Sequence, residues 1–457
     1  MNERKYFGTD GIRGRVGEEP ITAEFALRLG RALGAVLGRE GVRPQVLIGK
    51  DTRLSGYMLE SALEAGLAAS GADAVLLGPL PTPAVAFLTR SQRATAGIVI
   101  SASHNPYEDN GIKLFSASGE KLDDAVEMAI EAELETPGPS ASPRDLGKAT
   151  RLPDAPGRYI EFLKSRLDGD LSALAGLHVI IDAAHGAAYQ VAPRLLDELG
   201  MRVGSIGISP NGFNINDGHG ATDVTALRAE VARTGAAIGL ALDGDADRLM
   251  AMTADGRLVD GDDLVYVLAR HWHARGVLRG PVVGTVMTNL GIEQALRDLG
   301  IGFERAAVGD RYVHQRLCEV NGILGGEASG HVICRHKAST GDGLMTALLL
   351  LEVMAESGRP LSELVTDLHR FPQKTINVRV TRNAKALLQD RSIQATRASV
   401  ERTLGENGRL VLRASGTEPL VRVTVEARDA AMVEAQAGLL ADVVRRVATA
   451  VADAEAA

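Results

Sequence analysis

The stretch Ile98-Val99-Ile100-Ser101-Ala102-Ser103-His104-Asn105-Pro106 joins a short apolar run directly to a polar, turn-forming segment. Such a junction is typical of a buried strand that ends at the ligand-binding edge of an α/β sheet. Working toward the N-terminus, Val46-Leu47-Ile48 predicts a second buried strand, and Thr22 precedes apolar residues at helical spacing, so it predicts a capped helix. The first part of the chain therefore predicts an α/β layer built on a parallel sheet.

The rest of the chain continues this alternation and then departs from it. Residues 136–156 contain five prolines, which disfavour regular structure and indicate a linker. Beyond Pro372, closely spaced strand patterns replace the strand–helix alternation. With roughly 150 residues per domain, 457 residues predict three or four domains. We expect three tandem α/β domains over residues 1–150, 151–255 and 256–370, and a smaller α+β domain over residues 371–457.

Composition limits the partners. The formal net charge is -8 with no basic run, so nucleic acid is not an expected partner. No apolar stretch is long enough to cross a bilayer and the start lacks a signal core, so we expect a cytoplasmic protein without a membrane partner. Cys318 and Cys334 are the only cysteines, too few for a disulfide framework or a four-cysteine zinc site.

Two loops carry the most specific chemistry. In the first, Ser103 lies beside His104, and a serine hydroxyl becomes a useful nucleophile when a base or charged group assists it. In the second, Asp243, Asp245 and Asp247 follow an apolar strand at alternate positions. Carboxylates brought together in this way repel one another and require a cation, and hard oxygen ligands suit Mg²⁺. Taken alone, either loop also fits an ordinary polar turn.

Two further loops follow apolar runs. Gly325-Gly326-Glu327-Ala328-Ser329-Gly330-His331 offers a carboxylate and a hydroxyl that suit the hydroxyls of a sugar, while His331 alone is typical of a structural histidine. Arg413-Ala414-Ser415-Gly416-Thr417-Glu418-Pro419 combines a guanidinium, hydroxyls and a flexible backbone, and Arg422 adds charge nearby. That combination predicts a phosphate site, although a glycine-rich turn and an ordinary hairpin remain alternatives for these two loops.

Together these loops resemble the α-D-phosphohexomutase family. The matching segments, in chain order, are Phe7–Gly14, Ser101–Pro106, Asp243–Asp247, Val308–Tyr312, Gly326–His331 and Arg413–Pro419. The resemblance spans nearly the whole chain and implies four domains, with mixed sheets, around a central active-site cleft. Within the family, the chain is most similar to members that interconvert glucosamine 6-phosphate and glucosamine 1-phosphate.

The resemblance also implies roles for individual residues. It implies a phosphoserine at Ser103, with Ser101 the less favoured position, and Mg²⁺ held by the Ser103 phosphate, Asp243, Asp245 and Asp247. The sugar would contact Glu327 and Ser329. The phosphate that is not being transferred would contact Arg413, Ser415, Gly416 and Thr417, with Arg422 close by. Active-site supports would be Arg13, His104, Lys113 and Arg248, of which His104 or Lys113 would assist proton transfer.

By the same resemblance the substrate is a small sugar phosphate. Glucosamine 1,6-bisphosphate is the expected intermediate, this compound or glucose 1,6-bisphosphate would act as activator, and a homodimer is expected. Two residues depart from the family pattern, Ala328 in place of the usual Gln and Ala414 in place of the usual Pro. Because Ala328 would loosen sugar discrimination, activity on mannose or glucose phosphates remains an alternative. A magnesium-dependent phosphatase and a non-catalytic sugar-phosphate sensor are further alternatives.

Overall fold

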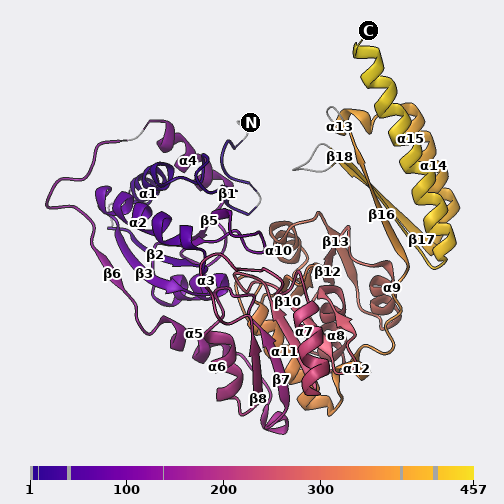
Figure 1. Cartoon of the computed structure of the whole chain (residues 1–457), viewed down its shortest axis with the longest axis horizontal. Helices are drawn as coiled ribbons and strands as arrows, with labels where there is room; N and C mark the ends of the chain where they lie inside the picture. The colour runs from indigo at the N-terminus through magenta and orange to yellow at the C-terminus, as the bar shows by residue number, and fades with distance from the viewer. Residues whose placement is uncertain are drawn as a thin grey trace. The chain divides into compact units, whose positions relative to one another are not determined.

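The computed structural model describes most of the chain. The described residues are 4–8, 10–38, 43–136, 138–380, 384–414 and 420–456. They form two compact units, of which one comprises residues 1–283 and 306–366 and the other comprises residues 284–305 and 367–457 (Figure 1). No helix among the described residues is long and apolar enough to cross a membrane.

The first unit begins with a six-stranded sheet in the order β1-β5-β4-β2-β3-β6. Its strands are β1 (Ile12–Arg15), β2 (Gln45–Lys50), β3 (Asp73–Pro79), β4 (Ala96–Ile100), β5 (Asp109–Ser116) and β6 (Ala149–Arg151). Its helices are α1 (Ala23–Leu37), α2 (Leu54–Ala69), α3 (Thr82–Ser91) and α4 (Asp124–Glu135). The expected cap is present, because the Thr22 hydroxyl accepts a hydrogen bond from the amide of Phe25 at 3.1 Å.

The first sheet is mixed, as expected from the resemblance, and only part of it is the parallel layer that its apolar runs predict. Strands β2, β3, β4 and β6 are parallel, whereas β5 runs antiparallel to both β4 and β1. The connection between β4 and β5, residues 101–108, is too short for a parallel crossover, so the chain turns back. That connection is the serine loop. The proline-rich segment, expected to be an irregular linker, also contains the short strand β6, which pairs with β3 at the edge of the sheet. Pairing with a neighbouring strand can form a strand even where the local sequence does not favour one.

Two more sheets complete the α/β part. The second, β11-β10-β9-β7-β8, comprises β7 (His178–Asp182), β8 (Arg202–Ile206), β9 (Ile238–Leu242), β10 (Leu249–Thr253) and β11 (Leu258–Val259), with helices α5 (Ala155–Lys164), α6 (Val191–Glu198) and α7 (Thr225–Thr234). The third, β13-β12-β14-β15, comprises β12 (Val282–Thr285), β13 (Phe303–Ala306), β14 (Leu324–Gly326) and β15 (Val332–Cys334), with helices α8 (Gly261–Ala274), α9 (Leu290–Asp298), α10 (Asp310–Glu319), α11 (Gly343–Ser357) and α12 (Leu361–Leu364). Both sheets are mixed, as expected from the resemblance.

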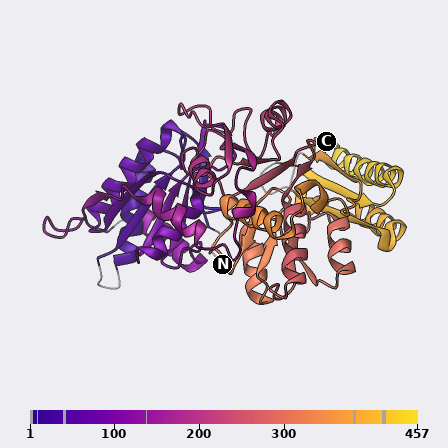
Figure 2. The ribbon, with the colours of Figure 1, turned by 90° about the horizontal axis from the view of Figure 1, so that it is seen from below.

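The second unit contains the expected antiparallel sheet, in the order β16-β18-β17. Its elements are β16 (Gln373–Arg379), α13 (Ala384–Leu387), α14 (Arg391–Leu404), β17 (Gly408–Ala414), β18 (Leu420–Ala427) and α15 (Ala430–Ala456). Helices α14 and α15 lie side by side and cover one face of the sheet (Figure 2). Alternate residues of β18, Val421, Val423 and Val425, are fully buried in the core beneath them.

Candidate active site

Ser103 meets the aspartate triplet inside the first unit. Its hydroxyl donates a hydrogen bond to Oδ2 of Asp243 at 2.6 Å, although 140 residues separate the two. The loops touch so closely that a Cβ on Gly244 would lie 2.6 Å from the carbonyl oxygen of Ser103. This position therefore requires glycine. The two loops that carry the most specific sequence signals thus form one site.

The backbone of Ser103 is held in an unusual conformation. Its φ is +55°, in the left-handed region that residues with a Cβ rarely adopt. Arg53, whose side chain is fully buried, contacts the loop repeatedly. Its Nη2 donates to the carbonyl oxygens of Ser103 at 3.0 Å and Asn105 at 2.8 Å, and its Nη1 donates to those of Asp109 at 3.0 Å and Pro106. A planar guanidinium satisfies these carbonyls at once and fixes the loop.

Ser101 has a structural position in the same loop. Its hydroxyl donates to Oδ2 of Asp51 at 2.6 Å and accepts a hydrogen bond from the amide of Ser103 at 2.9 Å. Asp51 in turn accepts from Nε of Arg53 at 2.7 Å. Ser101 is thus committed to holding the loop, whereas the Ser103 hydroxyl faces the carboxylates.

The aspartate triplet has the properties of a cation site. Asp243, Asp245 and Asp247 are at most 6% exposed, and one carboxylate oxygen from each lies within 4.8 Å of the others. Among the described residues, Oδ1 of Asp245 and Oδ1 of Asp247 are buried without a hydrogen-bond partner. Burial, followed by the charges of Asp247 and Asp245, raises the pKa of Asp243 well above its usual range. Hard oxygen ligands that repel one another, two of them with no hydrogen-bond partner among the described residues, fit Mg²⁺.

Two cations border the triplet. The Nζ of Lys113, buried on β5, lies 2.8 Å from Oδ2 of Asp245 and 3.4 Å from Oδ2 of Asp247. The Nε of Arg248 lies 3.9 Å from Oδ2 of Asp243 and 3.8 Å from Oδ1 of Asp247. Both side chains, for which the resemblance implies supporting roles, thus lie beside the carboxylates of the triplet.

A closed ring of alternating charges extends from the triplet. We define the charge ring as Asp247, Lys113, Asp10, Lys121, Asp310 and His331. Lys113 lies 3.3 Å from Asp10, whose other oxygen is 2.6 Å from Lys121, and Lys121 is 2.7 Å from Asp310. The His331 ring closes the circuit, with Nε2 3.6 Å from Asp310 and Nδ1 3.6 Å from Asp247. Burial opposes the charged imidazole, but the carboxylates of Asp247 and Asp310 raise the pKa of His331 to about 9.

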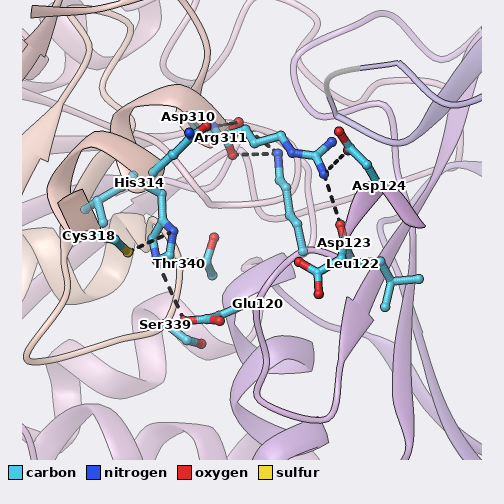
Figure 3. A pocket seen from close by; sticks show the side chains of 13 residues that line it. Glu120, Leu122, Asp123, Asp124, Asp310, Arg311, His314, Cys318, Ser339 and Thr340 are labelled. Atoms are coloured by element: carbon cyan, nitrogen blue, oxygen red, sulfur yellow. Dashed lines mark hydrogen bonds and ion pairs between the residues drawn. The ribbon is translucent and has the colours of Figure 1, made fainter. Parts of the chain in front are cut away.

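A cavity of about 490 Å³ opens beside one edge of the charge ring (Figure 3). Asp310 and Arg311, at the start of α10, face it from one side, and Arg311 pairs with Asp124 of α4 at 2.5 Å. Glu120 and Ser339 lie at its lower part in this view. The cavity is therefore lined mainly by charged and polar side chains.

His104 and Arg13 lie close to Ser103. The Nδ1 of His104 is 3.4 Å from the Ser103 hydroxyl. Burial, and next the positive charges of Arg248 and Arg13, lower the pKa of His104 to about 4, so its ring is neutral at pH 7. Arg13, on β1, pairs with Asp10. A neutral imidazole beside the hydroxyl has the geometry of a proton acceptor.

The expected sugar loop is also in the first unit. Glu327 accepts a hydrogen bond from the amide of Gly309 at 2.9 Å, so it is held by the segment that precedes Asp310. The amide of Gly261, at the start of α8, donates to the carbonyl of Ala328 at 3.3 Å. Glu327 and Ser329 remain partly exposed, which leaves them accessible to a ligand.

In the second unit, Arg413 and Arg422 are cross-strand partners on β17 and β18. Like charges directly opposite each other destabilise a sheet unless an anion lies between them. Burial, and next the charge of Arg422, lower the pKa of Arg413. The other predicted phosphate-site residues, Ser415, Gly416 and Thr417, lie outside the described residues.

Sequence reasoning missed several residues of the site. His331 was expected to be structural, yet it contacts the triplet, and Arg53, Asp10 and Lys121 were not singled out. Arg53 had a usable signal, because Asp51-Thr52-Arg53 directly follows an apolar strand, as the other site loops do. Lys121 had none, because its partners are 111 and 189 residues away.

Comparison with known proteins explains this arrangement. Family models for the phosphoglucomutase/phosphomannomutase domains match four consecutive segments: α/β/α domain I (residues 4–139), α/β/α domain II (157–256), α/β/α domain III (260–371) and the C-terminal domain (376–443). The chain belongs to the phosphoglucomutase/phosphomannomutase family. The enzyme is therefore a phosphohexomutase, an isomerase, and the family resemblance read from its loops is confirmed.

This chain is 56% identical to curated relatives over almost the full length of the chain. One is the phosphoglucosamine mutase of Xylella fastidiosa strain Temecula1, with 450 aligned residues that cover 98% of this chain and 100% of the relative. Another is the phosphoglucosamine mutase of Xanthomonas campestris pv. campestris strain B100, with 457 aligned residues that cover 99% and 100%.

Solved structures show the same fold. A phosphoglucomutase/phosphomannomutase family protein from Burkholderia thailandensis superposes with a TM-score of 0.82 at 25% identity, covering 98% of both chains. The N-acetylphosphoglucosamine mutase of Aspergillus fumigatus, solved with GlcNAc-6P and magnesium, superposes with a TM-score of 0.66 at 18% identity, covering 98% of this chain and 96% of that one. The predicted fold class is confirmed.

Proposed function

We propose that this phosphohexomutase interconverts glucosamine 6-phosphate and glucosamine 1-phosphate through a phosphoserine at Ser103. The observation that carries the proposal is the buried Ser103 hydroxyl, 2.6 Å from Asp243 in a triplet of carboxylates suited to a cation. The names of the 56% identical relatives support glucosamine as the sugar.

The proposed reaction is two phosphoryl transfers of opposite direction. The bond between the Ser103 oxygen and phosphorus breaks as a bond forms from phosphorus to the free sugar hydroxyl, which loses its proton. This step yields glucosamine 1,6-bisphosphate. The bisphosphate then reorients, so that its other phosphate faces Ser103. That phosphoryl group is transferred to the Ser103 oxygen, and the sugar oxygen from which it departs takes up a proton. His104, neutral and 3.4 Å from the serine hydroxyl, and Lys113 are the candidate proton carriers.

Asp243, Asp245, Asp247 and the phosphate on Ser103 would hold Mg²⁺. When bound, the ion neutralises negative charge on the phosphate during in-line transfer. Arg248 and Lys113 contribute fixed positive charge beside the same carboxylates. The ion and these two side chains offset the repulsion that three buried carboxylates otherwise create.

The two ends of the sugar need separate sites. We assign the ring hydroxyls to Glu327 and Ser329, and the phosphate that is not being transferred to Arg413, Arg422, Ser415, Gly416 and Thr417. The four domains then carry the serine loop (1–150), the metal loop (151–255), the sugar loop (256–370) and the phosphate loop (371–457). A sugar 1,6-bisphosphate would activate enzyme that lacks the phosphate on Ser103. A homodimer stays a prediction from the family resemblance.

A turnover comparison tests the proposal. Purified enzyme would be assayed with glucosamine 1-phosphate, mannose 1-phosphate and glucose 1-phosphate at equal concentrations, with Mg²⁺ and a sugar bisphosphate. We expect the highest kcat/KM with glucosamine 1-phosphate, and equal or higher values with a neutral sugar would contradict the assignment. Inorganic phosphate would be measured in parallel, because release in proportion to sugar consumed would indicate a phosphatase instead.

A further inference from the structure

A second pocket in the first unit is strongly basic. It has a volume of about 310 Å³, and none of the residues that line it belongs to the serine or aspartate loop. Arg90 approaches it from the end of α3, Arg166 from the segment after α5, and Arg335 and Lys337 from the segment after β15. Four basic side chains line it against a single carboxylate, that of Glu120. In a chain whose net charge is -8, this concentration of positive charge is unusual.

Three of the four basic groups have no carboxylate partner among the described residues. In the part of the chain that the structure describes, no ion pair engages the guanidinium of Arg90, Arg166 or Arg335. Arg335 instead donates from Nη1 to the backbone carbonyls of Leu317 and Gly322, both at 3.1 Å, and these bonds hold its charge in place. Positive groups that converge without counter-charges repel one another, and an anion bound among them removes the repulsion.

Lys337 is held in place as well. Its side chain is buried and its Nζ donates to the carbonyl oxygen of Arg166 at 2.7 Å and to Asp168 at 2.6 Å. Because the Asp168 side chain is 60% exposed, water screens this carboxylate more than it screens the lysine. The pocket therefore keeps its positive character despite this ion pair.

The pocket also offers neutral donors. Ser118 and Ser339 contribute hydroxyls. The Nε of Arg166 and both ring nitrogens of His336 are buried and find no hydrogen-bond partner among the described residues. Burial, and next the charge of Lys337, lower the pKa of His336 to about 4, so at pH 7 its neutral ring has one N–H to donate. A buried donor without a partner is costly, and a bound acceptor would satisfy it.

We propose that this pocket binds a small phosphate-bearing molecule at a site separate from the catalytic one. Arginine forks and a lysine ammonium suit a phosphate dianion, while Glu120, Ser118 and Ser339 suit hydroxyl groups attached to it. The volume lies at the small end of the range for small-molecule sites, which fits inorganic phosphate or a monosaccharide phosphate. The proposal does not depend on the mutase activity.

The basic pocket lies where segments of three domains meet, so a ligand bound there should affect the stability of the unit. Glu120, His314 and Ser339 line both this pocket and the larger cavity beside the charge ring (Figure 3). The basic residues come from segments matched by the domain I, II and III models, so a ligand here joins three domains of the fold. Binding should therefore raise the thermal stability of this unit.

Calorimetric titration with orthophosphate and, separately, with glucose 6-phosphate tests the proposal on the full chain. The double variant Arg90→Gln/Arg335→Gln is compared with wild type and with Arg158→Gln, an exposed arginine of α5 that pairs with Asp154. We expect wild type and Arg158→Gln to show a binding event beyond the catalytic site, weakened about tenfold or more in the double variant. Turnover should stay within about twofold in all three proteins, because these residues lie outside the catalytic loops.

A crystal soaked with tungstate, a heavy analogue of phosphate, locates the anion directly. An anomalous peak among Arg90, Arg166 and Arg335 supports the proposal. A peak confined to the serine and Arg413 loops, or equal phosphate affinity in wild type and the double variant, overturns it. Binding that requires molar phosphate indicates an adventitious ion only and also overturns it.

Tighter binding of glucose 6-phosphate than of orthophosphate would identify the sugar ester as the occupant. If the double variant misfolds, Arg90→Gln alone, which removes an exposed side chain, replaces it.

Discussion

The fully buried guanidinium of Arg53 donates a hydrogen bond of 3.0 Å to the backbone carbonyl oxygen of Ser103. The same side chain binds the carbonyls of Asn105, Pro106 and Asp109, so one residue holds the turn that presents the reactive hydroxyl. The left-handed φ of Ser103 is strained, by about 1–3 kcal/mol, and persists only because these contacts over-determine it.

Arg53→Lys should therefore lower kcat more than it changes KM. A lysine keeps the positive charge but cannot donate to four carbonyls at once, so the Ser103 hydroxyl loses its fixed position. We expect kcat to fall by roughly 10–100-fold, in line with the cost of a small misplacement of reacting groups. Steady-state kinetics measures both constants, and Arg158→Lys serves as the exposed control. A change confined to KM would contradict a positioning role.

Ser103→Ala should abolish turnover while the fold is retained. Removing the group that carries the phosphate leaves no route for transfer, so we expect a loss on the order of 10³-fold or more. Intact-mass measurement before and after phosphatase treatment, with peptide mapping of residues 91–115, would find the phosphate on Ser103 in wild type. Ser101→Ala is the matched control and should keep that phosphate, although its loop is weakened. Phosphate found only on Ser101 would reverse the assignment.

Local features of the fold were predictable, and distant pairings were not. The cap at Thr22, the strand at Val46–Ile48 and the loop after Ile100 depend on neighbouring residues, and all three are where the sequence placed them. Mixed sheets were expected from the resemblance, but the apolar runs alone predict only a parallel layer; the antiparallel course of β5 follows from the short connection that precedes it. Lys121 and Asp310 could not be paired in advance, because periodicity carries no information about contacts between distant segments.

Asp245→Asn should raise the magnesium concentration needed for activity. The substitution removes one of three carboxylates that share the cation, but keeps a side chain that can accept the hydrogen bond from the Thr82 hydroxyl, 2.6 Å from Oδ2 in wild type. We expect half-maximal activity at roughly 10–100-fold higher Mg²⁺, because fewer charged ligands bind the ion more weakly. Chelation should abolish turnover in wild type, and added Mg²⁺ should restore it. A chelator-resistant activity would rule out a role for the triplet as a cation site.

Lys121→Met should lower kcat/KM by roughly 10-fold or more, since breaking a partly buried ion pair leaves the opposite charges uncompensated. The ammonium links Asp10 and Asp310, and through them it positions Lys113 and His331. Lys121→Arg keeps the charge and should recover part of the loss. If Lys121→Met and Lys121→Arg lose activity equally, with unchanged melting temperatures, the positive charge of Lys121 does not support catalysis. Lys5→Met, at an exposed lysine that pairs with Glu135, controls for loss of a positive charge.

Asp342→Asn should change how stability depends on pH. Asp342, the N-cap of α11, is buried, and burial raises its pKa to about 6. Between about pH 4 and pH 6 the Asp342 carboxyl is protonated in the folded state but has lost its proton in the unfolded chain. The free energy of unfolding of the wild type therefore falls as the pH rises through this window, by about 3 kcal/mol in all. Asparagine can still accept the hydrogen bond from the amide of Met345 through its single side-chain oxygen, and its NH2 group can donate to the hydroxyl oxygen of Tyr159, without a charge. The melting temperature of the variant relative to wild type, followed by calorimetry from pH 4.5 to pH 7, should therefore increase with pH. Asp390→Asn, at the partly exposed cap of α14, should show almost no trend over this range, because its lowered pKa places its titration below about pH 4. A constant difference for Asp342→Asn as well would show that the Asp342 carboxyl does not titrate in this range.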